Sequence, residues 1–166
     1  MIPDVNQRFP VEEVEDGHTL ARALFRRRYR LEIPDFPLHV VGFWVDDQGS
    51  RHPACYIHWS RDGDILLGGG ACSDDRLLRR LPAADRQALR TVGGIYRHTL
   101  VRSLAIYADR CSALFGYSGD ALAIRETCAA GFEPTGHPHL LVHFPRPLPP
   151  ERRRELIAQA HAIGPF

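Results

Sequence analysis

The sequence contains no lysine, so all 21 of its basic residues are arginine. Asp and Glu together number 20 and the net charge is only +1, so the chain lacks the strong positive field of a nonspecific nucleic-acid-binding protein. Codon bias in a GC-rich genome would explain arginine without lysine. Arginine also binds phosphate through a planar, two-pronged set of donors that lysine lacks. We therefore expect no nucleic-acid partner, and any anion binding to be local.

Long apolar runs and closely spaced cysteine pairs are missing as well. No run approaches the roughly 18 apolar residues of a membrane span, and the first 30 residues contain no apolar stretch of signal-peptide length. The four cysteines, Cys55, Cys72, Cys111 and Cys128, form no CxxC pair. These absences predict a cytoplasmic protein with reduced thiols and no membrane partner.

The nine histidines raise the question of a metal site. Cys55 and His58 have a spacing that metals use, and His139 and His143 would lie on one side of a regular strand. Two strand positions four residues apart are separated by roughly 13 Å, which is too far for one ion to bind both. Zinc would need further ligands from elsewhere in the chain, so we expect no metal site.

The pattern of apolar residues and turns predicts one domain over residues 1–166, built from alternating strands and helices. Short turns make the three central strands antiparallel neighbours. Prolines at 145–150 lead into a C-terminal helical extension, 145–166, whose helix packs on its own sheet or on a second subunit of a homodimer. The expected strands are 11–14, 38–45, 53–59, 65–72, 111–117 and 139–144, and the expected helices are 19–30, 83–109, 121–130 and 151–162.

Glycines interrupt two of these elements. Gly68, Gly69 and Gly70 lie inside a strand, where glycine is unfavourable unless a bulge is present or something approaches the backbone closely. Gly93 and Gly94 interrupt the apolar spacing of helix 83–109. Either this helix begins or bends at the pair, or the pair lets a ligand or a neighbouring backbone come close.

Two motifs resemble those of the GNAT acyltransferase (acyl-CoA N-acyltransferase) superfamily. Residues 120–132, DALAIRETCAAGF, resemble the late helix of that family, which ends in Gly-Phe. Residues 90–96, RTVGGIY, resemble its glycine loop before the long helix, with Ile95 where a glycine would recur. The order of elements over residues 10–144 is also similar. The resemblance implies an α/β (α+β) fold with a mixed, mostly antiparallel central sheet flanked by helices.

The resemblance also implies a site for acetyl-CoA or another acyl-CoA, bound as co-substrate. Its thioester arm would lie between strands 65–72 and 111–117, and its pyrophosphate would lie on backbone N–H groups where the long helix begins. The alternative is that the glycine triplet forms a bulge and the glycine pair a helix contact. The candidate coenzyme contacts are Leu67, Gly68, Gly69, Gly70, Arg79, Arg80, Arg90, Gly93 and Gly94.

The same resemblance predicts acyl transfer, typically of an acetyl group, to a small-molecule amine by direct attack on the thioester. Thr127 stands where the family usually has a tyrosine that protonates the leaving thiolate, and Tyr117 is a nearby alternative acid. Asp74 and Asp75 are candidate bases, with His58 as another. Residues 30–38 and 132–139 are expected to form the acceptor pocket. The alternative is a catalytically degenerate protein that binds a CoA derivative or a protein partner as a sensor or accessory subunit.

Overall fold

The computed structural model describes residues 1–35 and 38–166, and its centre is a seven-stranded sheet with the order β1-β2-β3-β4-β5-β7-β6. Strands β4 and β5 pair in parallel, and the other neighbouring strands pair in antiparallel orientation. The mixed, mostly antiparallel sheet predicted from the sequence is therefore confirmed. The strands are β1 (Val11–Val14), β2 (Leu38–Val45), β3 (Arg51–Asp62), β4 (Ile65–Ser73), β5 (Ala113–Tyr117), β6 (Glu133–Pro134) and β7 (Leu140–His143).

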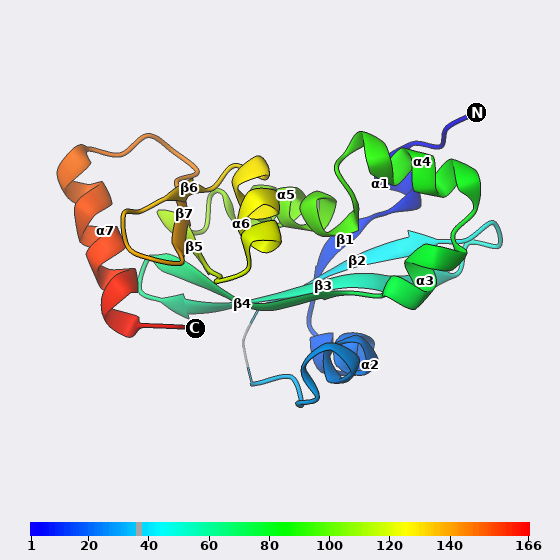
Figure 1. Ribbon diagram of the computed structural model, residues 1–166, viewed down its shortest axis with the longest axis horizontal. Coiled ribbons are helices and arrows are strands. Elements are labelled where there is room, and N and C mark those ends of the chain that lie inside the picture. Colours follow the sequence, from blue (N-terminus) through cyan, green and yellow to red (C-terminus); the bar gives the residue numbers. More distant parts are fainter. Residues whose placement is uncertain (36–37) are drawn as a thin grey trace.

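Helices cover both faces of this sheet (Figure 1). One face carries α1 (Val5–Arg8), α4 (Ala83–Thr91), α5 (Ile95–Tyr107) and α6 (Ala121–Ala129), and α2 (Gly17–Tyr29) lies on the other. The short helix α3 (Asp75–Arg80) follows β4, and α7 (Pro150–Ile163) lies at the β5–β7 end. No helix in the described part of the chain is long and apolar enough to span a bilayer.

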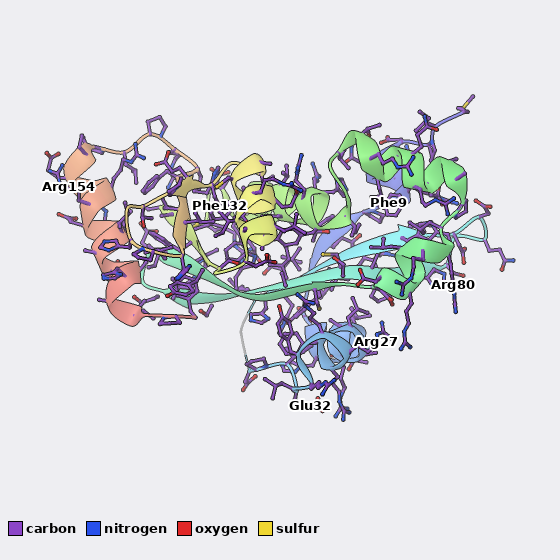
Figure 2. The ribbon with its side chains drawn as sticks, in the orientation of Figure 1. Phe9, Arg27, Glu32, Arg80, Phe132 and Arg154 are labelled. Carbon is purple, nitrogen blue, oxygen red and sulfur yellow. The ribbon has the colours of Figure 1, made fainter. Side chains whose placement is uncertain are left out.

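The alternation of side chains along β4 divides the core between the two faces. Leu66 packs in the cluster that holds Leu100 and Leu104 of α5, whereas Ile65 and Leu67 pack with Leu156 of α7. Figure 2 shows side chains filling the space between the sheet and the helices above and below it. Burial of Leu156 fixes α7 on its own sheet, which is one of the two arrangements expected for it.

Aspartates, among them Asp4 before α1, begin four of the described helices, because a carboxylate oxygen can accept from the N–H groups that a helix leaves unpaired in its first turn. Asp16 accepts from Thr19 N at 3.0 Å, Asp74 from Arg76 N at 3.1 Å, and Asp120 from Leu122 N at 3.1 Å. With Asp120 as its cap, α6 begins at Ala121, the residue at which the sequence predicts this helix to begin.

A buried carboxylate joins α4 to the first residues of the chain. Asp85, which is 2% exposed, accepts hydrogen bonds from Arg8 Nε and Trp44 Nε1, both at 2.8 Å. These bonds hold α4, and with it the turn that leads into α5, against α1 and β2.

Most predicted elements are present with shifted ends. The segment 83–109 is two helices, since α4 ends at Thr91 and α5 begins at Ile95, which is one of the outcomes expected for the glycine pair. Gly93 and Gly94 have φ of +80° and +97°, a conformation that favours glycine and stops the first helix. The short elements α1, α3 and β6 were not predicted, and residues 36 and 37 of the expected acceptor loop lie outside the described residues.

Candidate functional site

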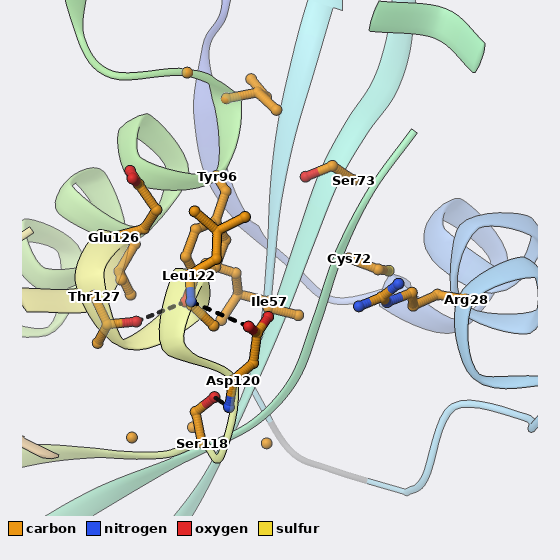
Figure 3. A pocket seen from close by; sticks show the side chains of 18 of the residues that line it. Arg28, Ile57, Cys72, Ser73, Tyr96, Ser118, Asp120, Leu122, Glu126 and Thr127 are labelled. Carbon is orange, nitrogen blue, oxygen red and sulfur yellow. Dashed lines mark hydrogen bonds between the residues drawn. The ribbon is translucent and has the colours of Figure 1, made fainter. Parts of the chain in front are cut away.

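A cavity opens where β4 and β5 part. Their parallel pairing runs from Ile65 and Ala113 to Gly68 and Gly116. Beyond it lies a cavity of about 630 Å³, a volume typical of small-molecule sites. Figure 3 shows its lining side chains, which come from both faces of the sheet. The lining includes Arg28 and Tyr29 of α2, Gly68, Gly69 and Cys72 of β4, Asp75 and Leu78 of α3, Gly93 to Tyr96, Gly116 to Ser118, and Glu126 and Thr127 of α6.

The glycine triplet forms a bulge in β4. Ile57 pairs with Ala71 and Trp59 pairs with Gly68, so two steps along β3 match three along β4. The bulge turns the N–H of Gly70 toward β3, where it donates to Nε2 of His58 at 2.9 Å. A Cβ at Gly69 would lie 2.0 Å from the same nitrogen. Both reasons considered for the triplet therefore hold, because the strand bulges and an imidazole approaches its backbone.

The N-terminus of α5 faces the same cavity. Gly94 is its N-cap residue and provides no side-chain cap, and Gly93, Gly94 and Ile95 line the cavity. The N–H groups of the first turn have no partner within the helix, and the helix dipole adds partial positive charge there. This end of a 13-residue helix is therefore suited to an anion.

Tyr96 is a cavity residue that the sequence analysis did not single out. Its hydroxyl lies 3.1 Å from Oγ1 of the buried Thr127, one of the predicted catalytic residues. Burial raises the pKa of Tyr96, and the hydrogen bond with Thr127 opposes part of that rise. In the sequence, Tyr96 is the last residue of the motif 90–96 and an apolar position of the predicted helix 83–109. Its place two residues after Gly94 was the available signal.

The other predicted acid, Tyr117, also lines the cavity. It stands at the end of β5, and its ring packs against His139 and Phe166.

The three predicted bases have different surroundings. Asp74 is occupied, because one carboxylate oxygen caps α3 and the other accepts from Arg27 at 2.7 Å. Asp75 is exposed and lines the cavity. His58 is buried and lies outside the cavity lining, and burial lowers its pKa to about 4.

The predicted coenzyme contacts are brought together only in part. Gly68, Gly69, Gly93 and Gly94 line the cavity. Leu67 packs against α7, away from the cavity, and the backbone N–H of Gly70 donates to His58. Arg79, Arg80 and Arg90 are exposed on α3 and α4, outside the lining. The arginine of the lining is Arg28 of α2, which was not among the predicted coenzyme contacts.

A second charged pair lies at the α6 side of the cavity. Arg97 donates to Glu126 at 2.6 Å, and this bond, with Arg125, lowers the pKa of the Glu126 carboxyl. Among residues 1–35 and 38–166, no group of three or more His, Cys, Asp or Glu side chains is arranged to hold a metal ion.

No protein-family model matches the sequence, and no curated protein matches it. Solved structures do match. The ribosomal-protein-S5-alanine acetyltransferase of Vibrio fischeri aligns over 86% of this chain and 96% of its own, with a TM-score of 0.54 and 12% identity. The coenzyme A-bound Escherichia coli protein YhhK, named as a candidate N-acetyl transferase, aligns over 82% and 98%, with a TM-score of 0.53 and 10% identity. Tetrahymena GCN5 aligns over 85% of this chain and 98% of its own, with a TM-score of 0.51 and 11% identity.

The chain has the GNAT fold. At these identities the likeness concerns the fold, and it confirms the fold expected from the two motifs. In this fold, the cavity where β4 and β5 part is lined by four of the predicted glycines, Gly68, Gly69, Gly93 and Gly94. Tyr96 and Thr127 also line it, and their hydroxyl oxygens lie 3.1 Å apart.

Proposed function

We propose that this protein is an acyl-CoA-dependent N-acyltransferase that transfers an acetyl or similar small acyl group to a small amine. The proposal rests on the cavity between β4 and β5. The N-terminus of α5, which is suited to an anion, and the bulge of β4 both lie at this cavity. A co-substrate with a pyrophosphate at one end and a thioester at the other fits that arrangement. The coenzyme A bound to YhhK supports the same class of co-substrate.

The chain's own groups would divide the work along the cavity. The N–H groups at the start of α5 would bind the pyrophosphate, with Gly93 and Gly94 permitting close approach. Gly68 and Gly69 would leave room for the thioester arm beside β4. These contacts would place the acyl carbonyl near the bulge, on the α2 side of the gap.

The reaction would be direct aminolysis. The amine nitrogen attacks the acyl carbonyl and loses a proton, the carbon–sulfur bond breaks, and the thiolate gains a proton. Asp75 is the candidate to accept the amine proton, because it is the predicted base that lines the cavity. Tyr96 is the candidate to protonate the sulfur, since its phenol lies beside Thr127, and burial keeps it protonated.

Binding without turnover is the second candidate function. It is favoured by Thr127, because a threonine hydroxyl is a far weaker acid than the tyrosine usual at that position. In that case the protein would bind a CoA derivative or a protein partner as a sensor or accessory subunit, and it would release no thiol.

Calorimetric titration with acetyl-CoA tests the shared part of both candidates. Saturable binding is expected, and no heat and no thermal shift at millimolar acetyl-CoA would overturn both. Release of free coenzyme A thiol with a panel of amines then separates them. Amine-dependent release supports the transferase, whereas binding without release across the panel favours the second candidate.

A further inference from the structure

We infer that the acceptor amine also carries an anionic group, a carboxylate or a phosphate, and that Arg28 binds it. This inference rests on the proposed function, because it names the class of acceptor for the same cavity. Arg28 projects from the last turn of α2 toward Cys72 and β4, and lines the cavity (Figure 3).

The guanidinium of Arg28 lies near two neighbours that line the cavity. Cys72 and Tyr29 both line the cavity, and the Tyr29 hydroxyl donates to the carbonyl of Ala71 at 2.7 Å. Burial raises the pKa of both groups, to about 12 for Cys72, and the nearby Arg28 opposes that rise in each. The charge therefore lies at the cavity wall beside β4.

The face of the sheet on which Arg28 lies separates it from the expected phosphate site. Helix α5, whose N-terminus is suited to the pyrophosphate, covers the opposite face from α2 (Figure 1). A co-substrate anchored there and threaded between β4 and β5 would present its acyl end on the α2 side. Arg28 is thus placed for the acceptor rather than for the phosphates of the coenzyme.

The other arginines of α2 have carboxylate partners, whereas within residues 1–35 and 38–166 Arg28 has a hydrogen bond with Tyr29 but no carboxylate partner. Arg26 pairs with Glu32 at 3.2 Å and Arg27 with Asp74 at 2.7 Å. Of the ion pairs formed by residues 1–35 and 38–166, none includes Arg28. A planar guanidinium at a cavity wall without a carboxylate partner is suited to a two-pronged bond with a ligand carboxylate or phosphate.

The acidic groups of the cavity do not favour a purely cationic acceptor. Glu126 is neutralised by Arg97, and Asp120 is used as the cap of α6. Asp75 lines the cavity and would contact the amine of the acceptor, while Arg28 would contact its anionic group. An acceptor with one amine and one anionic group, such as an amino acid or a phosphorylated amino alcohol, matches both charges.

Matched pairs of amines test the inference. Initial rates of thiol release are measured with β-alanine against β-alaninamide, O-phosphoethanolamine against ethanolamine, and each standard amino acid against its amide. The native protein is expected to show at least a tenfold higher kcat/KM for anionic members of one series, and the series shows whether carboxylate or phosphate is bound. Equal rates across every pair would overturn the inference while leaving the transferase function standing.

Three variants then assign the preference to Arg28. Arg28→Gln is expected to remove the preference through KM, Arg28→Lys to retain part of it, and the control Arg26→Gln to leave it unchanged. A preference that survives Arg28→Gln would overturn the assignment, as would a loss of acetyl-CoA affinity in place of the acceptor effect. If acetyl-CoA does not bind at all, the same anionic amines are titrated calorimetrically into the protein alone. Binding that Arg28→Gln abolishes then supports the anion site, and no binding overturns it.

Discussion

The backbone N–H of Gly70 donates a 2.9 Å hydrogen bond to Nε2 of His58 inside the bulge of β4. An acceptor nitrogen must be unprotonated, and burial lowers the pKa of this imidazole from 6.5 to about 4. Between those two values the unfolded chain binds a proton that the folded chain does not. The free energy of unfolding is therefore expected to fall as pH drops from 6.5 to 4, by up to about 3 kcal/mol.

Urea unfolding at pH 7.5 and pH 4.5 measures this effect. His58→Gln keeps an acceptor near Gly70 without a titrating ring, so its loss of stability across that interval is expected to be smaller. An equal loss in both proteins would assign the pH dependence to other groups, such as the buried His98, whose pKa is also lowered by burial.

Tyr96→Phe tests the candidate acid. Removing the phenol leaves the ring packing intact and is expected to lower kcat for thiol release about 100-fold, because general acid catalysis contributes on that order. The affinity for acetyl-CoA is expected to change less than threefold. Tyr117→Phe is the comparison, because Tyr117 also lines the cavity. A large loss of kcat in that variant, with Tyr96→Phe unaffected, would place the acid at the end of β5.

Gly116→Val tests occupation of the gap. A Cβ at Gly116 meets only ordinary contacts, 3.8 Å from Thr127 and 3.9 Å from Phe132, so the fold is expected to accept the change. The added methyls would narrow the cavity and weaken acetyl-CoA binding at least tenfold. Gly119→Val is the matched control outside the lining, and unchanged affinity in Gly116→Val would show that the arm does not pass there. At Gly69 a valine would collide with His58 and confuse binding with stability.

Asp85→Ala tests the link between α4 and the first residues. The change leaves Trp44 Nε1 and the Arg8 guanidinium without their shared acceptor, and is expected to cost about 3 kcal/mol of unfolding free energy. Asp85→Asn keeps one acceptor oxygen and is expected to lose less. Denaturant midpoints of the two variants measure the difference, and a loss below 1 kcal/mol in the alanine variant would contradict the prediction.

Arg90→Gln tests the predicted phosphate contact that lies nearest to the glycine pair in the chain. Arg90 stands in the last turn of α4, and its carbonyl accepts from Gly93 N at 3.2 Å. Loss of one exposed charge is expected to weaken coenzyme A binding about threefold, with a shallower salt dependence. Arg86→Gln, one turn earlier, is the control. Equal affinities in the two variants would remove Arg90 from the site.

The strands could be predicted because local patterns determine them, and the GNAT fold could be predicted because two motifs resemble those of that superfamily. Alternating apolar residues and short turns specified β2, β3 and β4, and Asp120 specified the start of α6. The roles of Tyr96 and Arg28 could not be predicted in this way, because each depends on which face of the sheet its helix covers. In the sequence, Tyr96 is one apolar position and Arg28 is one of several clustered arginines. Only the packed structure separates them from their neighbours.

The parallel pairing of β4 with β5 covers four residue pairs, from Ile65 and Ala113 to Gly68 and Gly116. This pairing joins two parts of the sheet, β1 to β4 and β5 to β7. Within the described residues, no other pair of strands connects the two parts. A ligand bound in the gap between β4 and β5 would contact both parts of the sheet and would hold them together in addition to the four residue pairs. Bound protein is therefore expected to exchange the amide hydrogens of β5 more slowly than free protein, even where no amide touches the ligand.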